Sequence, residues 1–266
     1  MIPVLSQLHR RSVKLLAAPI TIILVALGLS ACTRFQTTEI RLDGAADHMI
    51  ARLKRSNIDL QRFKCVGKMI LATGDQPSRS FRAALAGQLD DRLRIDMFAP
   101  FGGAAGTFAS DGRNLFLVMH PTREYYKKRF SGGSLRRLIH INITVDDLLA
   151  LLVGRIPMED EYLARLVPTE EGHAEFLEFV DWSRQVRQRI TVDASMHPRR
   201  SEWFDRHQRM THNLTFVGGQ MIDGFWLPER IELSGPNGAQ VTVVLERYEA
   251  NTELDERLFS PDNPWS

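Results

Sequence analysis

From residue 62 onward, apolar and polar residues alternate with a period of two over most of the chain. Leu93, Ile95 and Met97, for example, are separated by charged residues. This alternation predicts strands with one buried and one solvated face, as in antiparallel sheets. It predicts about a dozen strands, at residues 62–69, 80–89, 92–97, 106–110, 115–120, 123–130, 174–182, 186–194, 199–205, 210–217, 227–234 and 241–248.

Short turn sequences separate these strands, among them residues 74–77, 90–91 and 236–238. Consecutive strands joined by short turns form an antiparallel meander. A dozen strands are more than an open twisted sheet usually holds without curling. The predicted fold class is therefore α+β, mainly antiparallel β, with the strands in a half-closed (curled) β-barrel of about 11–12 strands.

Three segments have helical spacing instead. Residues 45–57 place Met49 and Leu53 on one face, which predicts an amphipathic helix. Residues 144–153 begin with the capping hydroxyl of Thr144 and continue into a leucine-rich stretch that ends at Gly154. A third, short helix is expected at 158–166.

The helix at 144–153 is apolar on most sides, so it cannot lie alone on a surface. An inner sheet face that is apolar needs a cover, and this helix is the natural candidate. We therefore expect helices to cover the hydrophobic mouth of the barrel, with Leu148, Leu149 and Leu152 as the lid.

The N-terminus has the order of a secretory signal peptide, assigned to residues 1–31. Basic residues including Arg10 and Arg11 precede an apolar run at 15–29, and small residues follow. Pro19 interrupts the run, which is short for a membrane-spanning helix. An ordinary signal peptide and a membrane anchor both remain open, and so does the export route, because Arg10-Arg11 weakly resembles a twin-arginine signal.

The segment Leu29-Ser30-Ala31-Cys32 resembles the bacterial lipobox. This resemblance implies that the Cys32 thiol is acylated and that the chain is cut just before it. Residues 32–44 would then be a lipidated tether. Cys65, the only other cysteine, would have no disulfide partner, and we expect it to be a small buried hydrophobic residue.

Net charge argues against a nucleic-acid partner. The whole chain carries +2, but residues 1–31 hold three of the 34 Lys and Arg and none of the 32 acidic residues. The remainder is therefore close to neutral, at −1, and has no basic footprint for nucleic acid.

Motifs for catalysis and metal binding are missing from the sequence. It contains no His-Glu-x-x-His, no Gly-x-Ser-x-Gly and no phosphate-binding loop. The acidic pairs at 90–91 and 146–147 are explained by a turn and a helix start. We expect no enzyme activity, no metal and no cofactor.

The uncharged loop at 99–106 holds Pro100, Phe101 and Gly102. From composition alone, Phe101 could be tucked inward or exposed at the tip. The two alternatives predict different roles, one in packing and the other in binding.

The order of these features resembles the LolB family of outer-membrane lipoprotein receptors, within a group that includes the periplasmic carrier LolA. The resemblance covers the lipobox, the early helix, the strand at 92–98 running into Ala99-Pro100-Phe101-Gly102-Gly103, the Gly112 turn, Thr144-Val145-Asp146-Asp147 with its leucine-rich helix, and the tail at 251–259. No single motif is specific; the order carries the resemblance.

The resemblance implies that residues 45–266 are one lipid-binding β-domain with a cavity for the acyl chains of lipoproteins. Pro100, Phe101 and Gly102 match a loop that enters the membrane, with Phe101 at its tip. The implied partners are acyl chains of lipoproteins, a periplasmic LolA-like carrier and outer-membrane lipid. The implied protein is a monomer anchored in the outer membrane of a Gram-negative bacterium, facing the periplasm. The residue after Cys32 is Thr33 and not Asp, which favours the outer membrane over the inner membrane.

Candidates for lining the cavity are apolar residues of the alternating strands. They are Phe63, Met69, Phe81, Leu85, Leu93, Ile95, Met97, Leu115, Leu117, Val241 and Val243. For any single one of them, plain core packing is the favoured role, and a cavity requires only that some of them contact the ligand. The chain departs from the enteric pattern with Phe at the loop tip, more glycine and a longer last third. A structural or assembly lipoprotein, or a carrier of another lipid, therefore remains an alternative.

Overall fold

The computed structural model describes residues 44–74, 76–89, 91–100, 102–129, 135–159, 162–168 and 175–266. The predicted signal segment, Cys32, most of the tether and Phe101 lie outside the described residues. Residues 41–266 form one compact unit. The whole described hydrophobic core lies in this unit. In the part of the chain that is described, no helix is long and apolar enough to cross a membrane.

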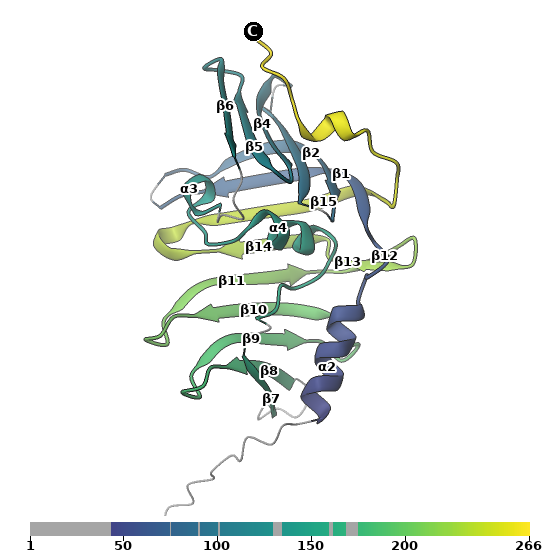
Figure 1. The fold of residues 1–266 in the computed structure, drawn as a ribbon, viewed down its shortest axis with the longest axis vertical. Coiled ribbons are helices and arrows are strands. Elements are labelled where there is room, and N and C mark those ends of the chain that lie inside the picture. The colour runs from purple at the N-terminus through teal and green to yellow at the C-terminus, as the bar shows by residue number, and fades with distance from the viewer. Residues whose placement is uncertain are drawn as a thin grey trace, which may run out of the picture. The chain divides into compact units, whose positions relative to one another are not determined.

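Thirteen strands form one antiparallel sheet (Figure 1), in the order β6-β5-β4-β3-β2-β1-β15-β14-β11-β10-β9-β8-β7. The first wing of the sheet is β1 (Arg62–Ala72), β2 (Arg79–Gln88), β3 (Arg92–Phe98), β4 (Ala104–Asp111), β5 (Asn114–Met119) and β6 (Glu124–Arg129). The second wing is β7 (Leu163–Pro168), β8 (Glu175–Val180), β9 (Val186–Val192), β10 (Pro198–Phe204), β11 (Met210–Val217), β14 (Arg230–Ser234) and β15 (Gln240–Ala250). The short strands β12 (Gln220–Ile222) and β13 (Phe225–Leu227) form a separate hairpin.

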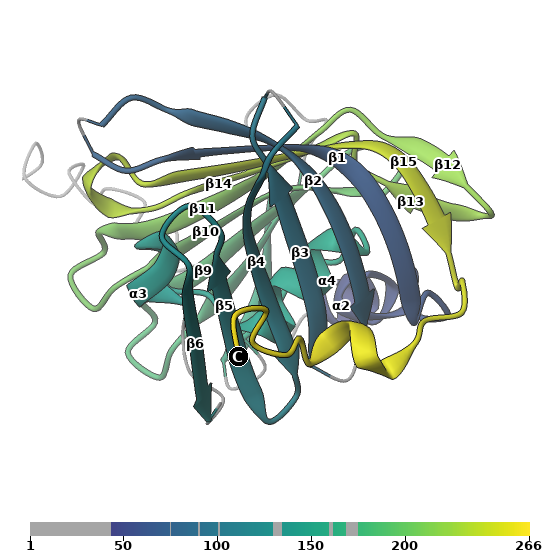
Figure 2. The ribbon, with the colours of Figure 1, turned by 90° about the horizontal axis from the view of Figure 1, so that it is seen from above.

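The chain starts in the middle of this sheet and finishes there. It runs outward from β1 to the edge strand β6, crosses to the opposite edge at β7 and returns strand by strand to β15, which pairs with β1. Figure 2 shows the sheet curling around its inner face. The predicted curled, incompletely closed antiparallel sheet is confirmed, with thirteen strands where about a dozen were expected.

Helices occupy the start of the described chain and the crossover between the wings. They are α2 (Gly44–Arg55), α3 (Arg136–Ile139) and α4 (Val145–Leu152), with short 3₁₀ turns at Pro236–Gly238 and Glu256–Phe259. α4 begins with a capping box: Thr144 Oγ1 accepts from Asp147 N at 3.1 Å, and Asp147 Oδ2 accepts from Thr144 N at 2.8 Å. After α4 the chain turns at Gly154, whose φ of +74° suits glycine.

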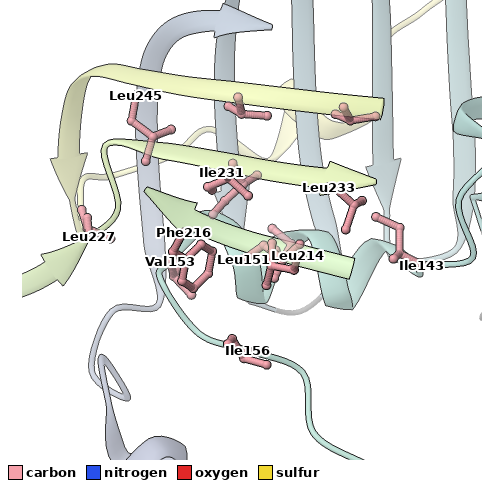
Figure 3. Packing of buried hydrophobic residues seen from close by; sticks show 14 of the residues in the cluster. Ile143, Leu151, Val153, Ile156, Leu214, Phe216, Leu227, Ile231, Leu233 and Leu245 are labelled. Atoms are coloured by element: carbon pink, nitrogen blue, oxygen red, sulfur yellow. The ribbon is translucent and has the colours of Figure 1, made fainter. Parts of the chain in front are cut away.

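Figure 3 shows the inner-face packing where α4 meets the second wing. Leu151 and Val153, from α4 and the residue after it, lie against Leu214 and Phe216 of β11. All four side chains are buried. The crossover segment thus fills the inner face of β11, β14 and β15.

The prediction of a helix at 158–166 is wrong. Residues 163–168 form β7 instead, and Arg165 pairs with Glu178 of β8. An ion pair of 2.7 Å joins these two side chains. Six residues with mixed polarity fit either period, and pairing with β8 decides between them.

The strand predicted at 227–234 is interrupted. β13 ends at Leu227, Pro228 follows, and β14 begins at Arg230. Proline has no N–H to donate to a sheet ladder, so it separates the two strands. The β12–β13 hairpin and α3 were not predicted.

Candidate functional site

All eleven predicted lining residues lie on the inner face of the sheet. The register shows it directly: Met69 pairs with Phe81 and with Val243, and Leu85 pairs with Ile95. The same register places the remaining members, Phe63, Leu93, Met97, Leu115, Leu117 and Val241, on that face. Contact between any of them and a cargo remains a prediction.

The middle of this face is filled by the protein's own side chains. Phe63 is fully buried and stacks on Tyr248 with ring centroids 5.4 Å apart. A Cβ on Gly87 would come within 2.4 Å of Phe63 and 2.7 Å of Leu149. Only glycine therefore allows α4 to pack this closely on β2.

The predicted lid residues belong to this packed helix. Leu149 and Leu152 are fully buried, and Leu148 is half-buried. Tyr248 Oη donates to Leu152 O at 3.2 Å, and Asn57 Nδ2 donates to Val153 O at 2.8 Å. α4 is thus held at its C-terminal end from two sides, and its opening as a lid remains a prediction.

The first wing becomes progressively more open toward its edge. One cross-strand row runs through Leu85, Ile95, Phe108, Leu117 and Tyr126, from β2 to β6. The exposed fraction is 2% at Leu85, 5% at Ile95 and 8% at Phe108. Leu117 is half-buried, and Tyr126 is 53% exposed. The apolar inner face is therefore accessible at β5, next to Glu124, Tyr126 and Lys128 on the inner face of β6. We call the half-buried residues Phe81, Met97, Leu115 and Leu117 the open inner face.

The outer face of the same wing is covered by the C-terminal tail. Phe259 of the tail is fully buried, Arg94 donates to Leu258 O at 2.9 Å, and Tyr125 Oη donates to Pro261 O at 3.2 Å. Small pockets of about 260 and 350 Å³ remain between tail and sheet. They are bordered by ionic side chains such as Arg94 and Asp96. The half-buried apolar side chains of β5 are accordingly those on the inner face, since Phe116 and Val118 on the outer face are buried.

A polar pocket of about 260 Å³ lies at the N-terminal end of α4. His212 borders it and stacks on Trp203 with ring centroids 4.4 Å apart. Burial lowers the pKa of His212 to about 4, and Asp147 opposes this shift only partly. The ring is therefore neutral at pH 7. The sequence offers His212 no metal-like spacing, and alternation alone does not show which polar residue on an inner face is enclosed.

The predicted membrane-insertion loop connects β3 and β4. Pro100 and Gly102 are exposed, and Gly102 N donates to Ala99 O at 2.9 Å. Gly102 has a φ of +90°, which explains a glycine in this tight turn. Phe101 lies outside the described residues, so its position stays a prediction.

Chemically reactive groups are scarce on the described part of the chain. No cluster of three or more His, Cys, Asp or Glu there could hold a metal ion. Cys65 is buried, as expected, and burial raises its pKa to about 12. Such a thiol is a packing group and a poor nucleophile.

No protein-family model and no curated protein matches the chain. Solved structures do match. A DUF1329 family protein from Desulfovibrio piger superposes with a TM-score of 0.58 at 16% identity, covering 82% of this chain and 96% of that one. A putative outer membrane lipoprotein-sorting protein domain from Vibrio parahaemolyticus gives a TM-score of 0.55 at 17% identity, over 81% and 97%. A LolA superfamily protein from Nitrosomonas europaea gives 0.55 at 14% identity, over 81% and 97%.

The chain has the LolA-superfamily fold. The resemblance to the LolA/LolB group seen in the sequence is thereby confirmed at the level of architecture. At these identities the LolA-superfamily fold is shared and the cargo is not specified.

Proposed function

We propose that this protein is a lipid-anchored outer-membrane receptor that binds the acyl chains of lipoproteins on its open inner face. The single observation that carries the proposal is the rise in exposure from Leu85 to Tyr126 along one apolar row. An accessible apolar surface on the inner face of a curled sheet suits a chain-like apolar ligand.

The energetics favour such a site. An acyl chain in water costs about 0.8 kcal/mol per CH₂ group, so a carrier must cover most of it with apolar side chains. The half-buried side chains of Met97, Leu115 and Leu117 offer such cover on the inner face. Binding of this kind needs apolar area and no catalytic group.

A pair of matched substitutions tests the site. Leu117→Glu places a charge on the open inner face, and we expect at least about a tenfold loss of binding of a fluorescent fatty acid. Leu163→Glu places the same charge at an exposed leucine on the opposite edge strand, β7, and should leave binding unchanged. Equal binding by wild type and Leu117→Glu would sink the proposed site.

Cys32 is the proposed attachment point of the lipid anchor, supported by the lipobox pattern alone. Cys32→Ala should abolish incorporation of radioactive palmitate and release the protein from outer-membrane fractions. Label that persists on the Cys32→Ala variant would refute this assignment.

The loop at Pro100, Phe101 and Gly102 is proposed to enter the membrane during delivery, with a LolA-like periplasmic protein as donor and the receptor acting as a monomer. The exposure of Pro100 and Gly102 supports it. Phe101→Glu should leave fatty-acid binding intact and stop transfer of a lipoprotein from the donor to vesicles. Normal transfer by Phe101→Glu would remove the loop from the mechanism.

Mass spectrometry of lipids that co-purify with residues 41–266 distinguishes the cargo classes. Triacylated peptides would support lipoprotein transport. Phospholipid or glycolipid alone would indicate a carrier of another lipid, and the absence of any lipid would favour a structural role.

A further inference from the structure

Three successive turns of the second wing are built in the same way. They join β8 to β9, β9 to β10 and β10 to β11, and they begin at Asp181, Asp193 and Asp205. In each, the carboxylate oxygen Oδ1 accepts backbone N–H groups two and four residues later, at distances between 2.8 and 3.1 Å. Each also has a residue with positive φ three positions after the aspartate: Arg184 (63°), Met196 (65°) and Gln208 (58°).

The position directly after the aspartate is not constrained by this geometry. It is Ala194 in one turn, Arg206 in another and Trp182 in the third. Trp182 is 93% exposed. Because its two sister turns have the same hydrogen bonds without an aromatic residue, Trp182 has no part in building the turn. A tryptophan ring left in water at a rigid hairpin tip indicates a binding partner.

The surroundings of Trp182 are basic. The turns holding Trp182 and Arg206 lie on the same side of the unit as α3 and the β14–β15 turn, on the left of Figures 1 and 2. We call this surface the turn rim, formed by residues 73–79, 136–140, 181–185, 205–210 and 235–239. Its arginines Arg79, Arg137, Arg184 and Arg206 are exposed and have no acidic partner among the described residues.

Acidic groups on the described part of the turn rim are limited to two aspartates, and both are neutralised locally. Asp181 is bound by Arg187 at 2.5 Å, and Asp205 by Arg209 at 2.8 Å. The hydrogen bond from the Ser183 side chain, with others, lowers the pKa of Asp181 to about 2, so this ion pair persists at neutral pH. The net charge offered to a partner is therefore positive.

A concave feature lies on the same rim. A pocket of about 940 Å³ opens between α3 and the β1–β2 and β14–β15 turns, with Arg137 and His140 in its lining. Guanidinium groups match phosphate oxygens in a two-point geometry. The exposed Leu138 of α3 adds an apolar side chain next to this basic pocket.

We propose that the turn rim docks on an anionic phospholipid bilayer, with Trp182 in the headgroup layer and Arg184 and Arg206 on lipid phosphates. Tryptophan prefers the membrane–water interface, where its ring is in a partly apolar layer and its N–H meets polar groups. Basic residues near such a surface are attracted to anionic headgroups. This docking does not depend on cargo binding or on the loop at Pro100, and it would orient the unit on a membrane.

Co-sedimentation with vesicles tests the proposal, using residues 41–266 so that neither the predicted lipid anchor nor the apolar run at 15–29 contributes. The wild-type unit should bind equimolar phosphatidylcholine–phosphatidylglycerol vesicles more strongly than pure phosphatidylcholine vesicles. Trp182→Ala, which installs the residue of the sister turn at Ala194, should reduce binding to the anionic vesicles about tenfold. The double variant Arg184→Gln and Arg206→Gln should remove the preference for anionic vesicles.

Met221→Ala is the matched control, because Met221 is an exposed apolar residue of the β12–β13 hairpin at the other end of the strands. It should bind vesicles like wild type, and all variants should keep the wild-type unfolding midpoint. Failure of wild type to bind vesicles, or equal binding by Trp182→Ala and wild type, overturns the proposal. The proposal would also be overturned if wild type bound a protein partner but no vesicles, and Trp182→Ala lost that partner. Fatty-acid binding should be unchanged in Trp182→Ala, so this test and that of Leu117→Glu can fail independently.

Discussion

The two wings of the sheet differ in how far they bury their inner faces. In the second wing, one cross-strand row runs through Leu233, Leu214, Ser201, Ile190 and Leu177, from β14 to β8, and all of these are buried. Only at the edge strand β7 does the row reach a half-buried residue, Leu166. In the first wing, burial is lost between Phe108 on β4 and Tyr126 on β6. Most strands of both wings have apolar residues at alternate positions, but the edge strand β6 of the first wing places Glu124, Tyr126 and Lys128 on the inner face.

The placement of the crossover between the wings contributes to this difference. α4 and the residues after it lie on β11, β14 and β15 (Figure 3), and α4 also packs against Gly87 of β2, but the inner side of β5 stays partly uncovered. A segment of this length cannot cover thirteen strands. Its placement divides one continuous apolar face into a stable core and a candidate binding surface.

Truncating one leucine in each wing is the strongest test of the difference between the wings. Leu214→Ala removes a fully buried side chain and should lower the free energy of unfolding by about 2–5 kcal/mol. Leu117→Ala, in the open part of the first wing, should cost less than about 1.5 kcal/mol, because the site is already partly solvated. Urea denaturation measures both, and similar losses would contradict the division into packed and open wings.

Acid should weaken the packed wing through His212. Its pKa is lowered by burial from 6.5 to about 4, so between these values the unfolded chain binds a proton that the folded chain does not. The free energy of unfolding should therefore fall as the pH is lowered from about 6.5 to 4, by about 3 kcal/mol in total.

His212→Gln should remove this part of the pH dependence, whatever its own effect on stability at pH 7. Denaturation of both proteins across that pH range is the measurement. A slope that is the same in wild type and variant would show that His212 titrates normally.

Loss of the Tyr248 hydroxyl should have the smallest effect of the three. Tyr248→Phe keeps the ring stacked on Phe63 but leaves Leu152 O without its donor, at a cost of about 1 kcal/mol. Tyr125→Phe is the matched variant. It removes a hydroxyl that also donates at 3.2 Å, here to Pro261 O in the half-buried tail. It should cost less, because water can replace the lost partner there. Equal losses in thermal unfolding would mean that the end of α4 is no better protected from water than the tail.

The sequence by itself determined the local features of this protein. A period of two requires pleated strands, so the shared face of Phe63, Leu85, Ile95 and Leu117 was predictable, and the signals of Thr144 and Gly154 predicted the limits of α4. These inferences hold because side-chain direction and capping depend on neighbours along the chain. The helix prediction at 158–166 failed because this segment's state does not depend on its neighbours along the chain alone. Its short pattern fits both periods, and pairing with β8 decides between them.

Only the tertiary structure decided which apolar residues are core and which remain accessible. Leu85 and Leu117 have the same sequence signal, yet the first is covered and the second is half-open, because burial depends on where the crossover helix lies over the sheet. The contrast between Trp182 and its sister residues Ala194 and Arg206 likewise became visible only when three turns proved to share one geometry. Burial and the gathering of charge are properties of contacts between distant segments, and a one-dimensional pattern does not contain them.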